Sequence, residues 1–185
     1  MRREKLVTAT CALGILACGA CFLPPPGPRA TAPPRRIDLG RNPEICVVVT
    51  NQSATHHIDP DVFARSIIDA INDGSKPRGL RARLCEGRGP GEALLQVSLL
   101  NETAVPRAYP QSSDFAWWTF MAKINATLAA SDGAVVSHLT NEPFRSNGST
   151  HVQNSDDPWL SPGAETWIRR GFSASLVRRM LNGNP

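Results

Sequence analysis

The chain has 185 residues, of which 41% are hydrophobic and 19% are charged. This length fits one folded domain together with a leader and a linker. The formal net charge is +4, but Arg2, Arg3 and Lys5 against Glu4 account for half of it, which leaves 17 basic and 15 acidic residues. Such a balanced remainder gives no support to a phosphate-binding surface, so the charge argues against nucleic acid as a partner.

The first 21 residues, MRREKLVTATCALGILACGAC, have the composition of a secretory leader. Residues 1–5 are basic, residues 6–17 form an apolar stretch of signal-peptide length, and small residues follow. The leader therefore predicts an exported protein, on the periplasmic side of a bacterial membrane.

Three fates of this leader are open. Cys18 or Cys21 could be the acylated first residue of a lipoprotein, because ILAC and CGAC approximate a lipobox. A signal peptidase could instead cut after Gly19 or Ala20. Alternatively, the 18 largely apolar residues 6–23 could remain as a membrane anchor. Each fate places the folded part outside the cytoplasm.

Residues 22–43 are rich in proline, arginine and alanine, which predicts an extended tether between the leader and a single domain at 44–185. Beyond the leader the chain has two cysteines, Cys46 and Cys85. In an exported domain this pair suggests one disulfide, although two buried free thiols are the alternative. A disulfide would close a loop of roughly 40 residues and stabilise the fold by about 3–4 kcal/mol.

The domain begins with a strand and a helix. Residues 44–51, EICVVVTN, are a continuous β-branched apolar run, typical of a central strand buried on both faces. Residues 58–74 are predicted to be helical, because Asp59 can cap the helix, Pro60 suits its first position and residues 72–74 can end it.

The following segments alternate between apolar and polar residues, which predicts strands. The segment 80–85 is one strand and the segment 93–103 is another. The segment 115–140 is predicted to be a long hairpin with Asp132-Gly133 as its two-residue turn.

The remaining chain is predicted to be a polar loop at 141–163 and an amphipathic helix at 163–183. The predicted fold class is therefore α+β, with a mixed sheet of about five strands in β-α-β-β-β-β-α order and both helices packed on one face. The strand-helix-strand start implies a right-handed parallel crossover, and the rest can form an antiparallel meander.

The segment THHIDPD has the most suggestive chemistry, because His56 and His57 stand beside Asp59 and Asp61. A metal site needs three or four converging donors, and adjacent histidines on an extended loop point in different directions. The expected interpretation is structural, with Asp59 as the helix cap and Asp61 beside the positive end of the helix dipole. No metal and no cofactor are expected.

Motifs of catalysis are missing from the sequence. There is no Gly-x-Ser-x-Gly elbow, and the glycine-rich segment 87–92 lacks the lysine and hydroxyl residues of a phosphate-binding loop. The carboxylates are scattered, with no pair marked for glycoside chemistry. The chain is therefore not expected to be an enzyme.

Two groups of residues are candidates for a binding surface. Trp117 and Trp118 lie in a predicted strand and must point to opposite faces, so one ring can enter the core. The other ring lies on the opposite face, where it meets a partner or is covered by the predicted loop at 141–163. Arg169 and Arg170 on the last helix, like the pair Arg178-Arg179, could meet anionic groups or could form a solvated face.

The segments LACGAC, ICVVVTN…DPDVFARSIIDAI and WWTFMAKINATLAASDGAVV together resemble small bacterial envelope lipoproteins. In outline the pattern is similar to the lipopolysaccharide-assembly lipoprotein and to the N-terminal domain of the translocation protein TolB. The resemblance implies an accessory role in an envelope assembly and transfers no site residue.

The predicted function is a non-enzymatic, envelope-tethered binding or assembly module with a protein partner, held at the membrane by a lipid or an anchor. The alternative is a soluble periplasmic protein that binds a small ligand or a metal through His56, His57 and Asp59.

Overall fold

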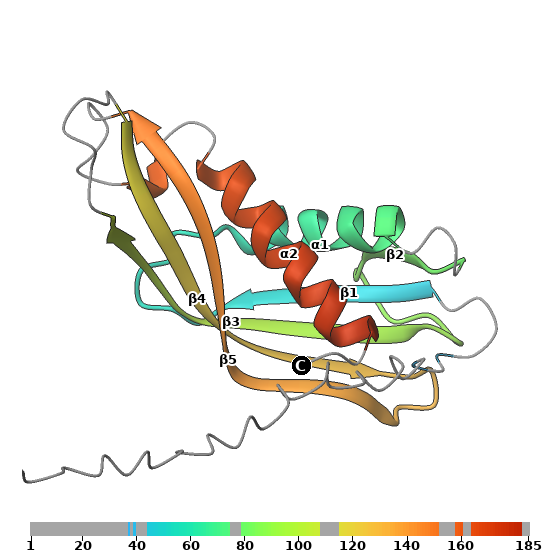
Figure 1. The fold of residues 1–185 in the computed structure, drawn as a ribbon. Coiled ribbons are helices and arrows are strands. Elements are labelled where there is room, and N and C mark those ends of the chain that lie inside the picture. Colours follow the sequence, from blue (N-terminus) through green and yellow to red (C-terminus); the bar gives the residue numbers. More distant parts are fainter. Residues whose placement is uncertain are drawn as a thin grey trace, which may run out of the picture. The chain divides into compact units, whose positions relative to one another are not determined.

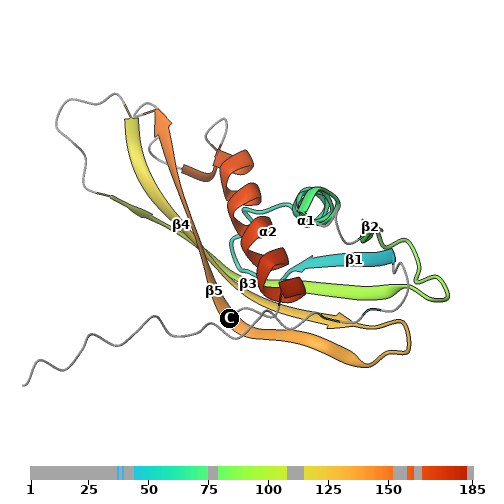
Figure 2. The same ribbon diagram turned by 45° about the vertical axis from the view of Figure 1, so that its right-hand side comes forward.

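The computed structural model describes residues 37, 39, 44–74, 79–107, 115–151, 158–160 and 164–182, which all lie in the unit Pro34–Pro185. In this part of the chain, five strands form one mixed sheet and two helices cover one of its faces (Figures 1 and 2), as the sequence predicts. The strands are β1 (Glu44–Asn51), β2 (Arg81–Leu84), β3 (Ala93–Pro106), β4 (Phe115–Ala129) and β5 (Val135–His151). The two helices on the sheet are α1 (Pro60–Gly74) and α2 (Ala164–Asn182), and a short 3-10 helix, η3 (Pro158–Leu160), precedes α2.

The strand order in the sheet is β2-β1-β3-β4-β5. Strand β1 pairs in parallel with β2 on one side and with β3 on the other, so Ile45 lies between Ala82 and Ala93. The predicted parallel crossover through α1 and the antiparallel meander of β3, β4 and β5 are both confirmed. Because β1 lies between two strands, the first part of its apolar run is buried, with Ile45 and Val47 at 0% exposure, whereas Val48 and Val49 are only partly buried.

The connection between β2 and β3 has to cross β1, since these two strands flank it. Cys46 points away from the helices because its neighbours Ile45 and Val47 point toward them. It is nevertheless fully buried, since Gly87 of the crossing loop lies 3.9 Å from its sulfur and Cys85 forms a disulfide with it. The predicted disulfide is confirmed. In the chain-entropy picture, closing the loop between the two cysteines stabilises the folded state by about 4 kcal/mol.

A second contact holds the same crossing loop. Arg83 donates from Nε and Nη2 to the Glu92 carboxylate at 2.7–2.9 Å, and its Nη2 also reaches the Gly87 carbonyl oxygen at 2.9 Å. The Gly89 N–H donates to Glu92 at 2.6 Å. The Gly89 amide and then the Arg83 guanidinium lower the pKa of Glu92, and the hydrogen bond to Glu92 raises the pKa of Arg83.

Strand β5 is longer than the sequence indicates. The prediction of a polar loop over 141–163 was wrong for residues 141–151, which pair with β4 as far as Phe115 opposite His151. The segment is polar because alternate residues, such as Arg145 and Asn147, face the uncovered side of the sheet while Phe144 is buried. Pro143 is tolerated because β5 is an edge strand.

The turn between β4 and β5 lies where it was predicted, but it is not a two-residue turn. The Ala130 N–H donates to the Ala134 carbonyl oxygen at 2.8 Å, so three residues lie between this pair. Gly133 N–H donates back to the Ala130 carbonyl, and Gly133 has a φ of 89° that glycine adopts without strain. A three-residue loop ending in a left-handed glycine is a common alternative to the two-residue turn.

The core lies between the sheet and the two helices. Helix α1 buries Phe63, Ala64, Ile67 and Ile71. In the segment 22–43, which was predicted to be an extended tether, Leu39 is buried and Ile37 packs against the core. The buried residues of α2 with large side chains are Ile168, Phe172, Leu176, Met180 and Leu181.

Helix α2 lies close to β5 because it carries a glycine at the contact. A Cβ added to Gly171 would lie 2.5 Å from Ser146 Oγ, which is closer than atoms can approach. Neither helix in the described ranges combines the length and the hydropathy that a membrane span requires.

The Arg83–Glu92 contact predicts a pH-dependent stability. A carboxyl whose folded pKa is lowered stabilises the protein above its ordinary pKa of about 4.3, and this contribution is lost as the pH falls through the lower, folded pKa. Glu92→Gln should therefore lower the urea midpoint at pH 7, and the difference from the unmodified protein should close in acid. As a control, Glu86→Gln changes an exposed carboxylate of the same loop and should lower the midpoint by less than Glu92→Gln does. A difference in urea midpoint between Glu92→Gln and the unmodified protein that stayed constant with pH would contradict the lowered pKa of Glu92.

Candidate binding surface

The face of the sheet opposite the helices is uncovered along β3, β4 and β5 in the described residues (Figures 1 and 2). Along β4, Ala116, Trp118, Phe120 and Ala122 are buried against the helix side, so the residues between them point outward. We call the outward residues at this end of the three strands the outer face. They are Thr103, Val105 and Arg107 beside β4 residues Trp117, Thr119, Met121 and Lys123, and β5 residues Pro143, Arg145, Asn147 and Ser149.

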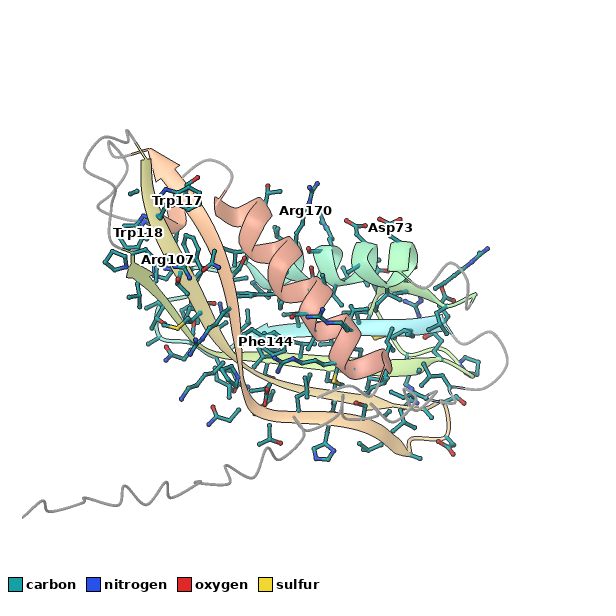
Figure 3. The ribbon with its side chains drawn as sticks, viewed as in Figure 1. Asp73, Arg107, Trp117, Trp118, Phe144 and Arg170 are labelled. Carbon is teal, nitrogen blue, oxygen red and sulfur yellow. A yellow bond between two sulfur atoms is a disulfide. The ribbon has the colours of Figure 1, made fainter. Side chains whose placement is uncertain are left out.

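The two adjacent tryptophans separate as strand geometry requires. Trp118 is 9% exposed and belongs to the core, whereas Trp117, its neighbour on β4 (Figure 3), is 43% exposed and by strand alternation points to the outer face. Val105 is 46% exposed on the neighbouring strand. Of the two predicted tryptophans, Trp117 is therefore the one whose ring is accessible to a partner.

A hydrogen-bonded row fixes the side chains next to Trp117. Arg107 Nε donates to Thr119 Oγ1 at 2.9 Å, and this hydroxyl donates to Asn147 Oδ1 at 3.1 Å. The Arg107 N–H also donates to the Trp117 carbonyl oxygen at 2.8 Å, which extends the pairing of β3 and β4 by one residue. The row therefore spans β3, β4 and β5, and it holds an arginine beside the exposed tryptophan (Figure 3).

The charges on the outer face have one sign. Arg107, Lys123 and Arg145 are exposed there. In the described segments 98–107, 117–127 and 138–149 the carboxylates are Glu102 and Glu142, and both bond to groups on the helix side. The outer face is therefore cationic and carries an exposed indole.

Asp59, His56 and His57 of the segment THHIDPD each have a structural role. Asp59 Oδ1 accepts the N–H groups of Asp61 and Val62 at 2.9 and 3.0 Å, so the predicted helix cap is confirmed. His56 has a φ of 49°, which places the chain in a tight turn. The His57 ring stacks on Trp159 with centroids 5.0 Å apart.

A buried carboxylate that the sequence does not single out organises this loop. Glu102 is 2% exposed and accepts the His57 N–H at 2.6 Å, the Ile58 N–H at 3.3 Å, the Asn51 side-chain amide at 2.7 Å and the Thr55 hydroxyl at 3.3 Å. It faces inward because the register of β3 against β4 shifts between Leu99 and Asn101, which reverses the alternation.

The aromatic stack continues into the core. Trp159 of η3 lies between His57 and Phe120, and it meets the Phe120 ring edge-on at 5.0 Å. The loop after β1, the strand β4 and the short helix η3 are thereby joined on the helix side of the sheet. The described part of the chain contains no group of three or more histidine, cysteine or acidic side chains able to hold a metal ion.

The arginines of α2 have separate surroundings. The side chain of Arg169 lies outside the described set, and Arg170 is exposed. Arg170 lines a groove between α1 and α2 together with Arg65, Asp69 and Asp73, so charges of both signs meet there. Arg179 forms an ion pair with Glu142 and lies over the Phe144 ring, 4.8 Å from its centroid.

Of the candidate site residues, the structure assigns Cys46 and Cys85 to the disulfide and places Trp117 on the outer face. Cys18 and Cys21 lie outside the described residues and remain predictions of lipidation. The sequence reasoning missed Arg107 and Asn147, because their roles depend on which strands lie side by side.

Comparison with known proteins gives a likeness of fold. No protein-family model and no curated protein matches the chain. A minor lipoprotein from Acinetobacter baumannii is 8% identical over 74% of this chain and 90% of its own, with a TM-score of 0.41. The uncharacterized lipoprotein B from Nitrosomonas europaea is 10% identical over 78% and 86%, with a TM-score of 0.40. The PelC dodecamer from Paraburkholderia phytofirmans is 12% identical over 82% and 96%, also with a TM-score of 0.40.

Bacterial lipoproteins are thus among the solved structures that this chain resembles in outline. The TM-scores are all below 0.5, so nothing about the function of this chain is carried over from these proteins. The likeness to the lipopolysaccharide-assembly lipoprotein and to the TolB domain remains a prediction.

The two tryptophans are predicted to contribute unequally to stability. Trp118→Ala should lower the free energy of unfolding by about 3–5 kcal/mol, because it leaves a cavity in the core. Trp117→Ala should lower it by less than about 1 kcal/mol, because Trp117 is 43% exposed and lies outside the core. Urea unfolding followed by circular dichroism measures both values, and similar losses in the two variants would contradict the assignment of faces.

The Glu102 contacts predict a costly isosteric change. Glu102→Gln should lower the free energy of unfolding by about 2–3 kcal/mol, because an amide NH2 group would then face backbone N–H donors. Hydrogen exchange at His57 and Ile58 should become faster. Glu142→Gln is the matched control, since that carboxylate is 37% exposed and its removal should cost less than about 1 kcal/mol. Equal effects at the two positions would rule out the proposed role of Glu102.

Proposed function

We propose that this chain is an exported, envelope-tethered module that binds a protein partner through its outer face and catalyses no reaction. The observation that carries the proposal is the exposure of Trp117, at 43%, on a sheet face that neither α1 nor α2 covers. Buried aromatic anchors contribute most to protein interfaces, and a tryptophan left open on a rigid sheet is suited to that role.

The leader and the segment that follows it supply the envelope location. Residues 1–21 have the features of an export signal with Cys18 and Cys21 as lipidation candidates, and the Pro-rich part of 22–43 that precedes Ile37 provides a connection. A domain held by such a connection remains near the membrane, where a partner in the envelope is at a high effective concentration.

The residues with catalytic or metal-binding chemistry support a non-enzymatic role, because the fold already uses them. Asp59 caps α1, His57 stacks on Trp159, and Glu102 accepts the hydrogen bonds of the loop between them. Cys46 and Cys85 are oxidised to a disulfide, so neither is a nucleophile.

The proposal is tested by photo-crosslinking in the native host. p-Benzoylphenylalanine is placed at position 117 of the full chain, and at position 138 as the control, because His138 is exposed on the same side of the sheet opposite Thr127, away from Trp117. Irradiation should give a discrete adduct from position 117 and little from position 138, and a protease should digest the attached mass. If position 117 gives no adduct, or a lipid adduct alone, the proposal is wrong.

A further inference from the structure

The chemistry of the outer face goes beyond a generic contact surface. Its exposed charged side chains in the described residues are Arg107, Lys123 and Arg145, all of them cationic. Trp117 and Lys123 are six residues apart on β4, which corresponds to about 20 Å at the strand rise of roughly 3.3 Å per residue. The outer face therefore extends over the length of a contact with a protein, which is longer than a site for a single ion.

The helix side of the same domain has a different charge pattern. The groove between α1 and α2 is lined by Arg65 and Arg170 together with Asp69 and Asp73. Surfaces of mixed sign do not select a charged partner, whereas a patch of one sign attracts the complementary charge and repels its own. The outer face therefore differs from this groove in that its exposed charges have one sign.

The outer face also has fixed geometry. Arg107 is held by Thr119, and Thr119 is held by Asn147, so the guanidinium is positioned before any partner arrives. Tryptophan and arginine are the residue types most enriched among the dominant contacts of protein interfaces. An arginine held in place beside an exposed indole suits a directional hydrogen bond to a carboxylate.

We propose that the outer face binds an acidic surface of a protein, with Trp117 and Arg107 as the central contacts and Lys123 and Arg145 as the charged rim. This inference rests on the proposed function and adds the chemistry of the partner. A lipid surface fits less well, because each cation near an anionic membrane raises binding about fivefold, the equivalent of about 1 kcal/mol, so three cations give only about a hundredfold. Mobile lipid headgroups would also make no use of the fixed row from Arg107 to Asn147.

The experiment uses the full chain and measures how fast Lys123 is acetylated, read by mass spectrometry of its peptide. Lys123 is the one lysine in the described residues, and it lies on the outer face. Poly-L-glutamate serves as the acidic polypeptide probe, and phosphatidylglycerol vesicles serve as the anionic lipid probe. Poly-L-glutamate should slow the acetylation of Lys123 several-fold at low salt, and added salt should abolish this protection.

Two variants with the same change in net charge locate the effect. Arg107→Gln with Arg145→Gln should weaken the protection of Lys123 about tenfold, because it removes two of the three cations of the outer face. Arg65→Gln with Arg170→Gln removes two exposed arginines from the helix side and should leave the protection intact. Circular dichroism spectra of both variants check that each is folded.

Three outcomes would overturn the inference. Lys123 could be unprotected by poly-L-glutamate, it could be protected equally in both double variants, or it could be protected by the vesicles and not by the polypeptide. If any of these occurred while position 117 still crosslinked to a protein, the acidic character of the partner would be wrong and the proposed function would stand. If no crosslink formed either, both would fail.

Discussion

The carboxylate of Glu102 is the contact on which the helix side of this fold depends. It is 2% exposed, and it accepts hydrogen bonds from four residues of the segment that leads from β1 toward α1. A buried carboxylate without donors would be very costly, and four donor groups without an acceptor would also destabilise the fold. Each side of the contact therefore requires the other, and together they fix the loop that carries His57 to Trp159 and places Asp59 at the start of α1.

The two faces of the sheet consequently have different roles. On the helix side, the ionisable side chains of Asp59, His57 and Glu102 are used in helix capping, ring stacking and hydrogen bonding. On the other side, Trp117 and three cations stand on strands whose inward residues are already packed. The residues available for recognition are those that the fold does not use, and the rigid sheet below them keeps their spacing constant.

The loop between β2 and β3 carries one cysteine of the disulfide, which bears on the compartment of the protein. The loop that crosses β1 is held by the Cys46–Cys85 disulfide and by the Arg83–Glu92 ion pair, and β2 has only four residues of its own. A short edge strand of this kind gains much of its order from the cross-link, which persists in an oxidising environment. The disulfide at this corner of the domain is therefore consistent with the export that the leader predicts.

The sequence by itself determined the α+β class, the order of the elements and the cap at Asp59, because each depends on local periodicity or on a local motif. It favoured a disulfide between the two cysteines, and the structure decided between this bond and two free thiols. Only the tertiary structure decided the roles of Glu102, Arg107 and Asn147. Glu102 faces inward through a shift of register near residue 100, and the Arg107–Asn147 row joins residues that are 40 positions apart along the chain. The polar residues 141–151 resembled a loop because an edge strand with one open face needs few apolar side chains. Strand register and the choice between faces arise from contacts between distant segments, and these contacts leave no periodic signal in the sequence.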